Sequence, residues 1–588
     1  MKNNFKNEWD FSLLYSSIDD ERIDKDIQEI ERLCTMFNSK YSVLDKNNFI
    51  KHENLIISLK DYFHIRSKLT PKPIVYLSLL LHKNSSNIKA QALLNKIISR
   101  ITNATNNLNF YIINLGNISD SEKENILNSE ILSKYRFFLR NVFLDAKHNL
   151  SEAEERIMSL KNLPASEMWD SGHDKILSSV MIKWKGKEIP LAQANSLIAD
   201  SSKNDRYKLA KLITIELKKL SVFSEAEMNA LVTNAKINDE LRKYTKPYEA
   251  TVDGYNNDLA TVEKLVEIVS NNFSIAHRFH KIKAKLLKLK VLKYSDRNAK
   301  YANIDGNYSF NNSIKSLIKV FGNFDKKYSD ILKKYLENGQ IDVYPKKGKT
   351  GGAYCWGTFE NPTFVLLNHV NSLHDYSTIA HEMGHAFHTE LSKDQGPVYS
   401  SYSTSLAETA STFFESLAFE SIIETLPDKQ KIIALHNQIN DDISTIFRQI
   451  ACFNLEKDIH NHVRENGYVS KEELADLHNK NMKAYLGSAF KLEHDDGYFF
   501  VQWGHLRRFF YVYTYAYGQL VSSALLRRYK QDKSFIVSIE KFLIAGGKDT
   551  PENILKNIGI DVTTGELFQE GIEEILQKII KLEKLVGM

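Results

Sequence analysis

The most reactive arrangement of side chains in this sequence is His-Glu-Met-Gly-His at residues 381–385. On a helix, residues four apart share one face, so His381 and His385 can bind one zinc ion through their imidazole nitrogens. Glu382 lies beside them, where its carboxylate can accept a proton from a water molecule on the metal. The pattern predicts a zinc-dependent hydrolase. The alternative is a buried helix whose histidines only satisfy hydrogen bonds.

The elements expected around this motif suit that chemistry. Residues 375–391 have the apolar period of an amphipathic helix, and Asp375 is the expected N-cap. Residues 361–368, just upstream, predict a short strand. The apolar stripe of the helix consists of Ile379, Met383, Ala386 and Phe387.

A catalytic zinc site needs a third protein ligand, for which the chain offers three candidates. A metzincin would need His at position 391 and Gly at position 388, but Leu391 and His388 stand there. His388 shares the face of His381, yet a helix rises about 1.5 Å per residue, which places it roughly 10 Å away. We therefore expect His388 to lie in the second shell or to pack, and Glu408 remains as the candidate ligand from another helix.

Glu408 opens a polar stripe on a second predicted helix at residues 405–426. A face at spacing i, i+3, i+4, i+7 can place one carboxylate on a metal and another against the outer nitrogen of a histidine ligand, and Glu415 is the expected second-shell partner. The alternative is an ordinary solvated face. The stripe consists of Glu408, Ser411, Thr412 and Glu415.

Two further segments carry side chains that could meet a peptide. Small residues let a substrate backbone approach, and a strand edge can pair with an extended peptide, so we expect substrate contact at the segment formed by Gly351, Gly352, Ala353 and Tyr354. A hairpin turn is the alternative. Residues 505–517 hold a histidine and four tyrosines, which can donate to the oxyanion formed when water adds to a carbonyl, or can pack in a core. They are His505, Tyr511, Tyr513, Tyr515 and Tyr517.

Taken together, these segments resemble the M3 (thimet oligopeptidase-like) zinc metallopeptidases, and among them the oligoendopeptidase F group. The matching segments follow family order over nearly the whole chain, at residues 9–15, 349–355, 381–385, 407–411 and 505–518. The resemblance implies one zinc ion per chain with Glu408 as third ligand. It also implies that His505, with Tyr511 and Tyr513, faces the zinc, whereas we assign Tyr515 and Tyr517 to the core.

The resemblance further implies a mainly α fold with a small β region beside the active site. Such a gluzincin-type metallopeptidase has two lobes around a deep substrate channel. We expect an N-terminal helical region at 1–109, a small family module at 110–195 and a catalytic region at 196–588. The implied activity is hydrolysis of internal bonds in short unfolded oligopeptides. The alternatives are a dipeptidyl carboxypeptidase of the same fold and a peptide-binding protein without turnover, against which the intact Glu382 argues.

Composition limits the size class, the cellular location and the partners that we expect for the protein. With 588 residues, 43% of them hydrophobic, the chain exceeds one typical core. Its three cysteines are odd in number and far apart in sequence, so they imply no disulfide framework. The sequence shows neither an apolar leader nor a membrane-length apolar run, so we expect a cytoplasmic protein without a membrane partner. The net charge of +5 is small, and the basic residues at 277–293 are typical of a solvated helix face. We therefore expect no nucleic-acid partner.

Periodicity also predicts elements elsewhere in the chain. Helical spacing appears at residues 20–37, 90–108 and 262–291. Alternation around Lys185 and Gly186 predicts a hairpin at 181–190. Short strands near the site are expected at 341–344 and 363–367.

Overall fold

The computed structural model describes residues 5–69, 71–302, 304 and 306–588. Helices make up 73% of the chain, about twice the share of an average globular protein. The β structure of the described residues is confined to short strands. The prediction of a mainly α fold with a small β region is therefore confirmed.

The chain forms two compact units. Unit 1 comprises residues 1–148, 306–421 and 529–558, and unit 2 comprises residues 149–305, 422–528 and 559–588. Each unit thus draws on three separate stretches of sequence. The division into three sequential domains and the deep channel between two lobes stay predictions.

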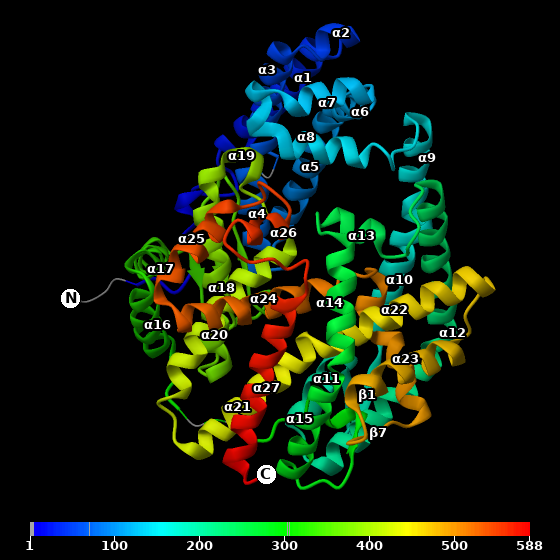
Figure 1. Ribbon diagram of the computed structural model, residues 1–588, viewed down its shortest axis with the longest axis vertical. Coiled ribbons are helices and arrows are strands. Elements are labelled where there is room, and N and C mark those ends of the chain that lie inside the picture. The colour runs from blue at the N-terminus through cyan, green and yellow to red at the C-terminus, as the bar shows by residue number, and fades with distance from the viewer. Residues whose placement is uncertain (1–4, 70, 303, 305) are drawn as a thin grey trace. The chain divides into compact units, whose positions relative to one another are not determined.

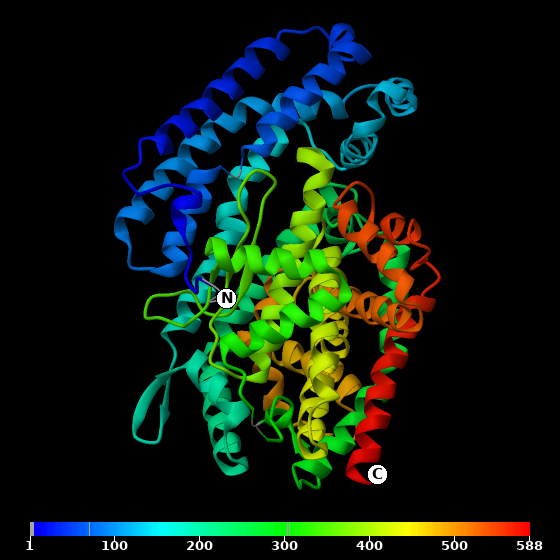
Figure 2. The same cartoon turned by 90° about the vertical axis from the view of Figure 1, so that its left-hand side faces the viewer.

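Unit 1 begins with a layer of helices. Their apolar faces pack into one core, to which α1 contributes Ile27, Ile30 and Phe37. The longer members of the layer lie side by side, blue to cyan in Figures 1 and 2. The helices are α1 (Arg22–Tyr41), α2 (Lys46–Phe49), α3 (His52–Ser67), α4 (Lys72–Lys83), α5 (Ile88–Thr105), α6 (Asn109–Gly116), α7 (Asp120–Asn128) and α8 (Arg136–Asp145).

A three-stranded sheet joins this layer. Its order is β4 (Ile341–Asp342), β6 (Phe364–Leu366), β5 (Tyr354–Trp356), with β6 parallel to β4 and antiparallel to β5. Trp9, near the start of the chain, is buried against it and donates a hydrogen bond from its indole nitrogen to the carbonyl of Val365 (2.9 Å). The strands are shorter than the predicted spans 341–344, 361–368 and 363–367, and β5 lies at an edge of the sheet.

The helix that carries the His-Glu-Met-Gly-His motif is α18 (Leu373–Ser392). Its N-cap is Ser372, three residues before the predicted cap, and Asp375 occupies the third helical position. The two side chains form a capping box, in which the Asp375 carboxylate accepts hydrogen bonds from the backbone and hydroxyl of Ser372. The predicted apolar stripe is buried, and Phe387 packs on Phe414 at 4.8 Å between ring centroids.

Gly384 allows α20 (Thr404–Ile423) to cross α18 closely. A Cβ at Gly384 would lie 2.7 Å from the Cα of Ser411 and 2.9 Å from the carbonyl oxygen of Ala410, distances that no side chain can occupy. The glycine inside the motif therefore sets the distance between the two helices (Figure 1). The rest of unit 1 comprises α16 (Phe310–Phe324), α17 (Lys326–Asn338), α19 (Gly396–Tyr399), α25 (Ile536–Ala545) and α26 (Pro551–Lys556).

Unit 2 is built on long helices. The predicted hairpin is confirmed as β1 (Met181–Trp184) and β2 (Lys187–Pro190), and its turn residues Lys185 and Gly186 both have positive φ. The predicted helix at 262–291 is instead two helices, α14 (Leu259–Asn271) and α15 (Phe273–Leu286). The others are α9 (Glu152–Asn162), α10 (Met168–Ser179), α11 (Leu191–Asp200), α12 (Lys203–Leu241), α13 (Glu249–Gly254), α21 (Asp428–Thr445), α22 (Phe447–Asn466), α23 (Lys471–Leu486), α24 (Tyr513–Gln531, whose last turn lies in unit 1) and α27 (Glu566–Val586).

Two remaining strands of unit 2, β3 (Leu292–Lys293) and β7 (Phe490–Lys491), pair in parallel. Within the described part of the chain, no helix combines the length and the apolar character needed to cross a membrane.

Candidate active site

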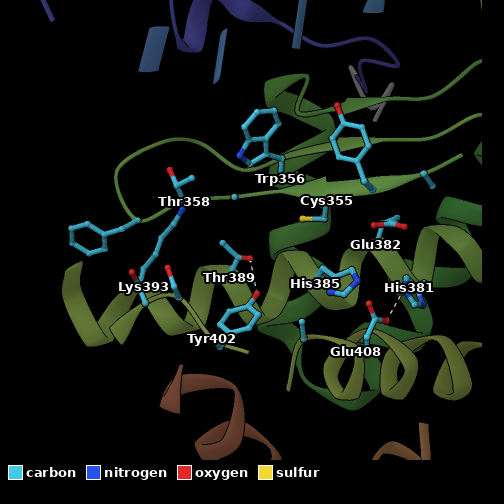
Figure 3. A pocket seen from close by; sticks show the side chains of 17 residues that line it. Cys355, Trp356, Thr358, His381, Glu382, His385, Thr389, Lys393, Tyr402 and Glu408 are labelled. Carbon is cyan, nitrogen blue, oxygen red and sulfur yellow. Dashed lines mark hydrogen bonds and ion pairs between the residues drawn. The ribbon is translucent and has the colours of Figure 1, made fainter. Parts of the chain in front are cut away.

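The structure brings His381, His385 and Glu408 together in unit 1. One ligand atom from each side chain lies within 4.8 Å of the other two, and the Nε2 atom of His381 is 3.7 Å from a carboxylate oxygen of Glu408. The two histidines project from one face of α18 and Glu408 from α20, as Figure 3 shows. The four-residue spacing of the histidines on α18 and the close crossing of α20 at Gly384 bring the three side chains together.

The donor set fits zinc. Zinc bonds of about 2.0–2.2 Å at tetrahedral angles place neighbouring ligand atoms about 3.4 Å apart, so the measured 3.7 Å needs only a small adjustment. Burial, together with the positive charge of His381, lowers the pKa of His385 to about 3, which keeps its imidazole neutral. Burial lowers the pKa of His381, but the hydrogen bond to Glu415 and the charges of the nearby carboxylates outweigh it and raise that pKa to about 9, so this ring would lose a proton on binding a metal. Two imidazoles and one carboxylate would leave a fourth position for water, as in catalytic zinc sites.

Glu415 and His388, the two residues expected beside the metal ligands, differ in their contacts. Glu415, two turns beyond Glu408 on α20, accepts a hydrogen bond from Nδ1 of His381 at 2.9 Å, which is the contact that the polar stripe predicts. His388 makes no hydrogen bond to a neighbouring ligand among the described residues. It is fully buried and stacks on the ring of Tyr402 at 3.5 Å between centroids, so the packing alternative holds for it.

Glu382 lies in the same pocket with one unused acceptor. Its side chain is 6% exposed, and its Oε2 atom has no hydrogen-bond partner in the described structure. Burial raises the pKa of Glu382 to about 7; the positive charge of His381 opposes this rise, and the charge of Glu408 adds to it. A buried carboxylate with a free oxygen near the metal ligands is suited to exchange a proton near neutral pH.

The pocket around this group has a volume of about 510 Å³. Ala353 and Tyr354 line it, whereas Gly351 and Gly352 lie in an exposed turn before β5 and outside the lining. Gly352 has a φ of +74°, and a Cβ at either glycine would meet open space. Of the four expected substrate residues, two therefore lie in the pocket and two in the adjacent turn.

Unit 2 holds the histidine and tyrosines of residues 505–517. Nδ1 of His505 forms a short hydrogen bond with the hydroxyl of Tyr511, and the ring of Tyr515 lies 5.7 Å from that of Tyr511. Burial, with Arg448 and Arg508 nearby, lowers the pKa of His505 to about 4, so its imidazole is neutral at physiological pH.

The structure separates Tyr513 from Tyr511, the two tyrosines that the resemblance places at the zinc. Tyr513 is fully buried and donates a hydrogen bond to Asn257 at 3.0 Å, so it belongs to the core. Tyr515, which we expected in the core, lies beside Tyr511 instead. Tyr511 lies in the turn just before α24, and its carbonyl accepts a hydrogen bond from the backbone N–H of Thr514 at 3.0 Å. This turn continues into the helix, so residues four apart lie on one side and residues two apart do not.

Sequence reasoning missed the residues that hold this segment. Phe510 has a φ of +63°, a costly conformation for an aromatic residue, and its backbone N–H donates to both carboxylate oxygens of buried Glu456 at 3.1 Å. Arg507 donates two hydrogen bonds to buried Glu227, at 3.0 and 2.8 Å. Buried acidic residues on α22 and α12 were the available signal, but nothing in the sequence pairs them with residues 507–510.

Comparison with known proteins identifies the family. The model of "Peptidase family M3" matches residues 215–574, which include the whole metal-ligand group and residues 505–517. The chain belongs to peptidase family M3. A second family model, described as "Oligopeptidase F", matches residues 114–180 of this M3 peptidase.

Curated relatives agree with this assignment. The M3 peptidase is 26% identical over 543 residues to group B oligopeptidase PepB of Streptococcus agalactiae, covering 89% of this chain and 88% of that one. It is 24% identical over 592 residues to an oligoendopeptidase F homolog of Borreliella burgdorferi, covering 99% and 98%. The chain is therefore a metalloendopeptidase of the oligoendopeptidase F type, an enzyme that hydrolyses peptides.

Solved structures share its fold. A crystal structure of a peptidase from Chlamydophila abortus has a TM-score of 0.86 and 24% identity, covering 100% of this chain and 99% of that one. Oligoendopeptidase-F from Enterococcus faecium has a TM-score of 0.72 and 17% identity, covering 96% and 99%. At these identities the likeness concerns the fold alone.

Proposed function

We propose that this M3 peptidase uses one zinc ion, held by His381, His385 and Glu408, to hydrolyse internal bonds of short unfolded peptides. The observation that carries the proposal is the convergence of these three side chains in one pocket with the free Oε2 atom of Glu382. When bound, the metal lowers the pKa of water toward neutrality and polarises the scissile carbonyl. The protein's own residues orient the metal ligands and transfer the proton.

Glu415 orients the first ligand. When Nδ1–H of His381 donates to the Glu415 carboxylate at 2.9 Å, the ring is fixed in the tautomer whose Nε2 lone pair is free. That Nε2 atom faces Glu408 at 3.7 Å. The hydrogen bond therefore supports His381 as a ligand that would hold the metal through Nε2, together with Glu408.

Glu382 is the proposed general base and general acid of the reaction. Its free carboxylate oxygen accepts the proton that water loses on attacking the peptide carbonyl, and the same oxygen passes it to the leaving amine as the C–N bond breaks. One water is consumed, and a new carboxyl and a new amino terminus result. The buried position of Glu382 supports this role, because burial keeps its pKa near the working pH.

His505 and Tyr511 are the proposed donors to the oxyanion. Their mutual hydrogen bond supports a pair in which the position of one fixes the other. Because the imidazole is neutral, the mutual hydrogen bond uses one of the two donors of the pair and leaves one free for the oxyanion. The amide of Gln449 lies 3.4 Å from Nε2 of His505, which favours Nδ1–H of His505 donating to the Tyr511 oxygen and leaves the Tyr511 O–H as the free donor, with its pKa raised by burial. Donors held in place before the reaction stabilise the developing negative charge without reorganising.

The edge strand β5 is the proposed docking site for the peptide backbone. An edge strand leaves backbone N–H and C=O groups free for pairing, and Ala353 and Tyr354 bring this edge into the metal-site pocket. The open space at Gly351 and Gly352 supports passage of the substrate backbone. The oligoendopeptidase names of the relatives support short peptides as substrates.

The function is tested by mass spectrometry of products from a mixed peptide library, with and without a chelator. We expect internal cuts that stop when zinc is removed and return when zinc is restored. Release of C-terminal dipeptides alone would indicate the dipeptidyl carboxypeptidase. Peptide binding without cleavage by the zinc-loaded protein would contradict enzymatic activity at this site, and digestion of stably folded proteins at internal sites would contradict the size limit.

Replacing Tyr511 by Phe is expected to lower kcat by at least about tenfold with little change in KM. An oxyanion donor acts on charge that exists only in the transition state, and loss of one costs about 10²–10³ in kcat when nothing replaces it. His505 or the neighbouring Tyr515 can replace part of the loss. Steady-state kinetics on one quenched peptide measure the effect.

Tyr513→Phe is the matched control for this measurement. It removes the same hydroxyl from a neighbouring tyrosine whose partner is Asn257. We expect lower thermal stability and unchanged kcat for this variant. Equal slowing of both variants would assign the effect of Tyr511→Phe to stability rather than to oxyanion binding.

A further inference from the structure

We propose that the far end of the metal-site pocket is a subsite for an acidic side chain of the peptide substrate, and that Lys393 selects it. The inference rests on the peptidase function proposed above and adds a class of preferred substrate.

The pocket follows one face of α18. Its floor consists of side chains at four-residue spacing that run from the metal ligands to the residue after the end of the helix: His381, His385, Thr389 and Lys393. Residues 353–359 form the opposite wall, and residues 400–402 line the same cavity. Figure 3 shows Lys393 at the end of the pocket away from His381, close to Thr358.

The two ends of this cavity differ in charge. Glu382 and Glu408 lie at the end where the metal binds. Lys393 is the one lysine or arginine among the described residues that line the pocket. The lining of the same cavity also carries hydroxyl groups, from Thr358, Ser400 and Ser401. An ammonium group among hydroxyls is a binding environment for a carboxylate.

The ammonium group of Lys393 is held in place. It donates to Glu390 at 3.0 Å and to the carbonyl of Asn361 at 3.4 Å, and the side chain is only 23% exposed. Lysine has three N–H donors, so one remains for a ligand. Lys393 is thus pre-oriented rather than free to move in solvent.

Glu390 offsets part of the charge of Lys393, but it does so from a position outside the pocket. It lies outside the lining and also accepts hydrogen bonds from Tyr335 and Thr363, both at 2.7 Å. Burial opposes ionisation of Glu390, but Lys393 and these two hydroxyls hold its pKa below the ordinary value. Glu390 therefore serves as the anchor for Lys393, and a substrate carboxylate would meet the exposed side of the ammonium.

The direction of β5 predicts where the acidic residue lies in the substrate. In Figure 3, Cys355 lies on the side of the metal ligands and Thr358 on the side of Lys393, and a Cβ at Gly357 would lie 2.4 Å from the side chain of Thr389. Strand β5 and helix α18 therefore run in the same direction toward Lys393. Antiparallel pairing is the more stable arrangement. A peptide paired antiparallel to β5 thus places residues before the scissile bond at Lys393.

The distance along α18 from the metal ligands to Lys393 indicates which substrate residue would meet Lys393. Lys393 follows His385 by eight residues, or about 12 Å of helix rise, and its long side chain shortens the gap. An extended peptide advances about 3.3 Å per residue. The selected Glu or Asp is therefore the second or third residue before the scissile bond.

The test compares peptides that carry Glu, Gln or Lys at each of the three positions before the scissile bond. For the zinc-loaded wild type we expect kcat/KM to be about tenfold higher with Glu than with Lys at the second or third position, the order of one hydrogen bond to a charged group. Lys393→Glu should reverse this preference, and Lys393→Arg should retain it. Lys319→Glu, which makes the same charge change at an exposed position on α16, should leave the preference unaltered.

The outcomes separate the subsite from the peptidase function. Wild-type cleavage without a Glu preference at any of the three positions would overturn the subsite, and this comparison needs no variant to fold. A preference that survives Lys393→Glu, in protein with normal circular dichroism and zinc content, would overturn the role of Lys393. An acidic preference confined to residues after the scissile bond would overturn the antiparallel register. A zinc-loaded wild type that cleaves none of these peptides would instead contradict the proposed function.

Discussion

Replacing Glu382 by Gln is expected to lower kcat by about 10²–10⁴-fold while the protein keeps its zinc, because general acid–base catalysis contributes about this much. Gln has the shape of Glu but cannot accept the proton that water loses. The metal ligands are unchanged, and the free Oε2 atom of Glu382 makes no hydrogen bond whose loss would disturb the fold of the described residues. Steady-state kinetics, with zinc content measured after dialysis, give the result.

Glu382→Asp supplies the matched control. It keeps a carboxylate but withdraws it by about one methylene, and a displacement of about 1 Å can cost about 10²-fold. We expect its rate to lie between those of the wild type and Glu382→Gln. A Glu382→Gln enzyme with near wild-type kcat would remove Glu382 from the reaction and leave the proton acceptor to another group.

The metal-ligand group was predictable from sequence because its geometry is mostly local. The four-residue spacing of His381 and His385 fixes their common face once the helix is recognised. The apolar stripe that ends at Phe387 fixes which face is buried. Glu408 and Glu415 followed from the same helical period on a second segment, and the structure places them 3.7 Å and 2.9 Å from the two ring nitrogens of His381.

Features that depend on helix boundaries were predicted less well. Tyr515, and not Tyr513, lies beside Tyr511, because the side on which each tyrosine lies depends on where α24 begins, which the alternating tyrosines do not indicate. Asp375 is the expected N-cap because Asp is a common cap, whereas Ser372 caps the helix and Asp375 completes the capping box. In both cases a shift of two or three residues changes the face on which a side chain lies.

Long-range constraints could not be predicted from one sequence. Gly384 is required by a crossing helix whose closest atoms belong to Ala410 and Ser411. Phe510 keeps a positive φ because Glu456, 54 residues earlier, accepts its backbone N–H. Such pairs follow from tertiary packing, and neither periodicity nor motif spacing contains that information.

Zinc retention should separate the ligand on α20 from its neighbours. Glu408→Ala removes one of three ligand side chains and is expected to leave the protein largely free of zinc after dialysis. Glu415→Gln keeps a hydrogen bond to His381 but loses its charge, and second-shell changes of this kind lower metal affinity by about 10–100-fold. His388→Ala should keep zinc at the wild-type level, because His388 stacks on Tyr402 and lies outside the ligand group.

The ranking of zinc retention among the three variants identifies the ligand, because each variant loses a polar group from α18 or α20 of the same unit. Metal content and zinc affinity by competition with a chelator give the order directly. His388→Ala is expected to lower the unfolding temperature, because removing a fully buried ring leaves a cavity. Loss of zinc from His388→Ala with retention in Glu408→Ala would transfer the third ligand position to His388. That result would also require α18 to bend, because a straight helix keeps His381 and His388 about 10 Å apart.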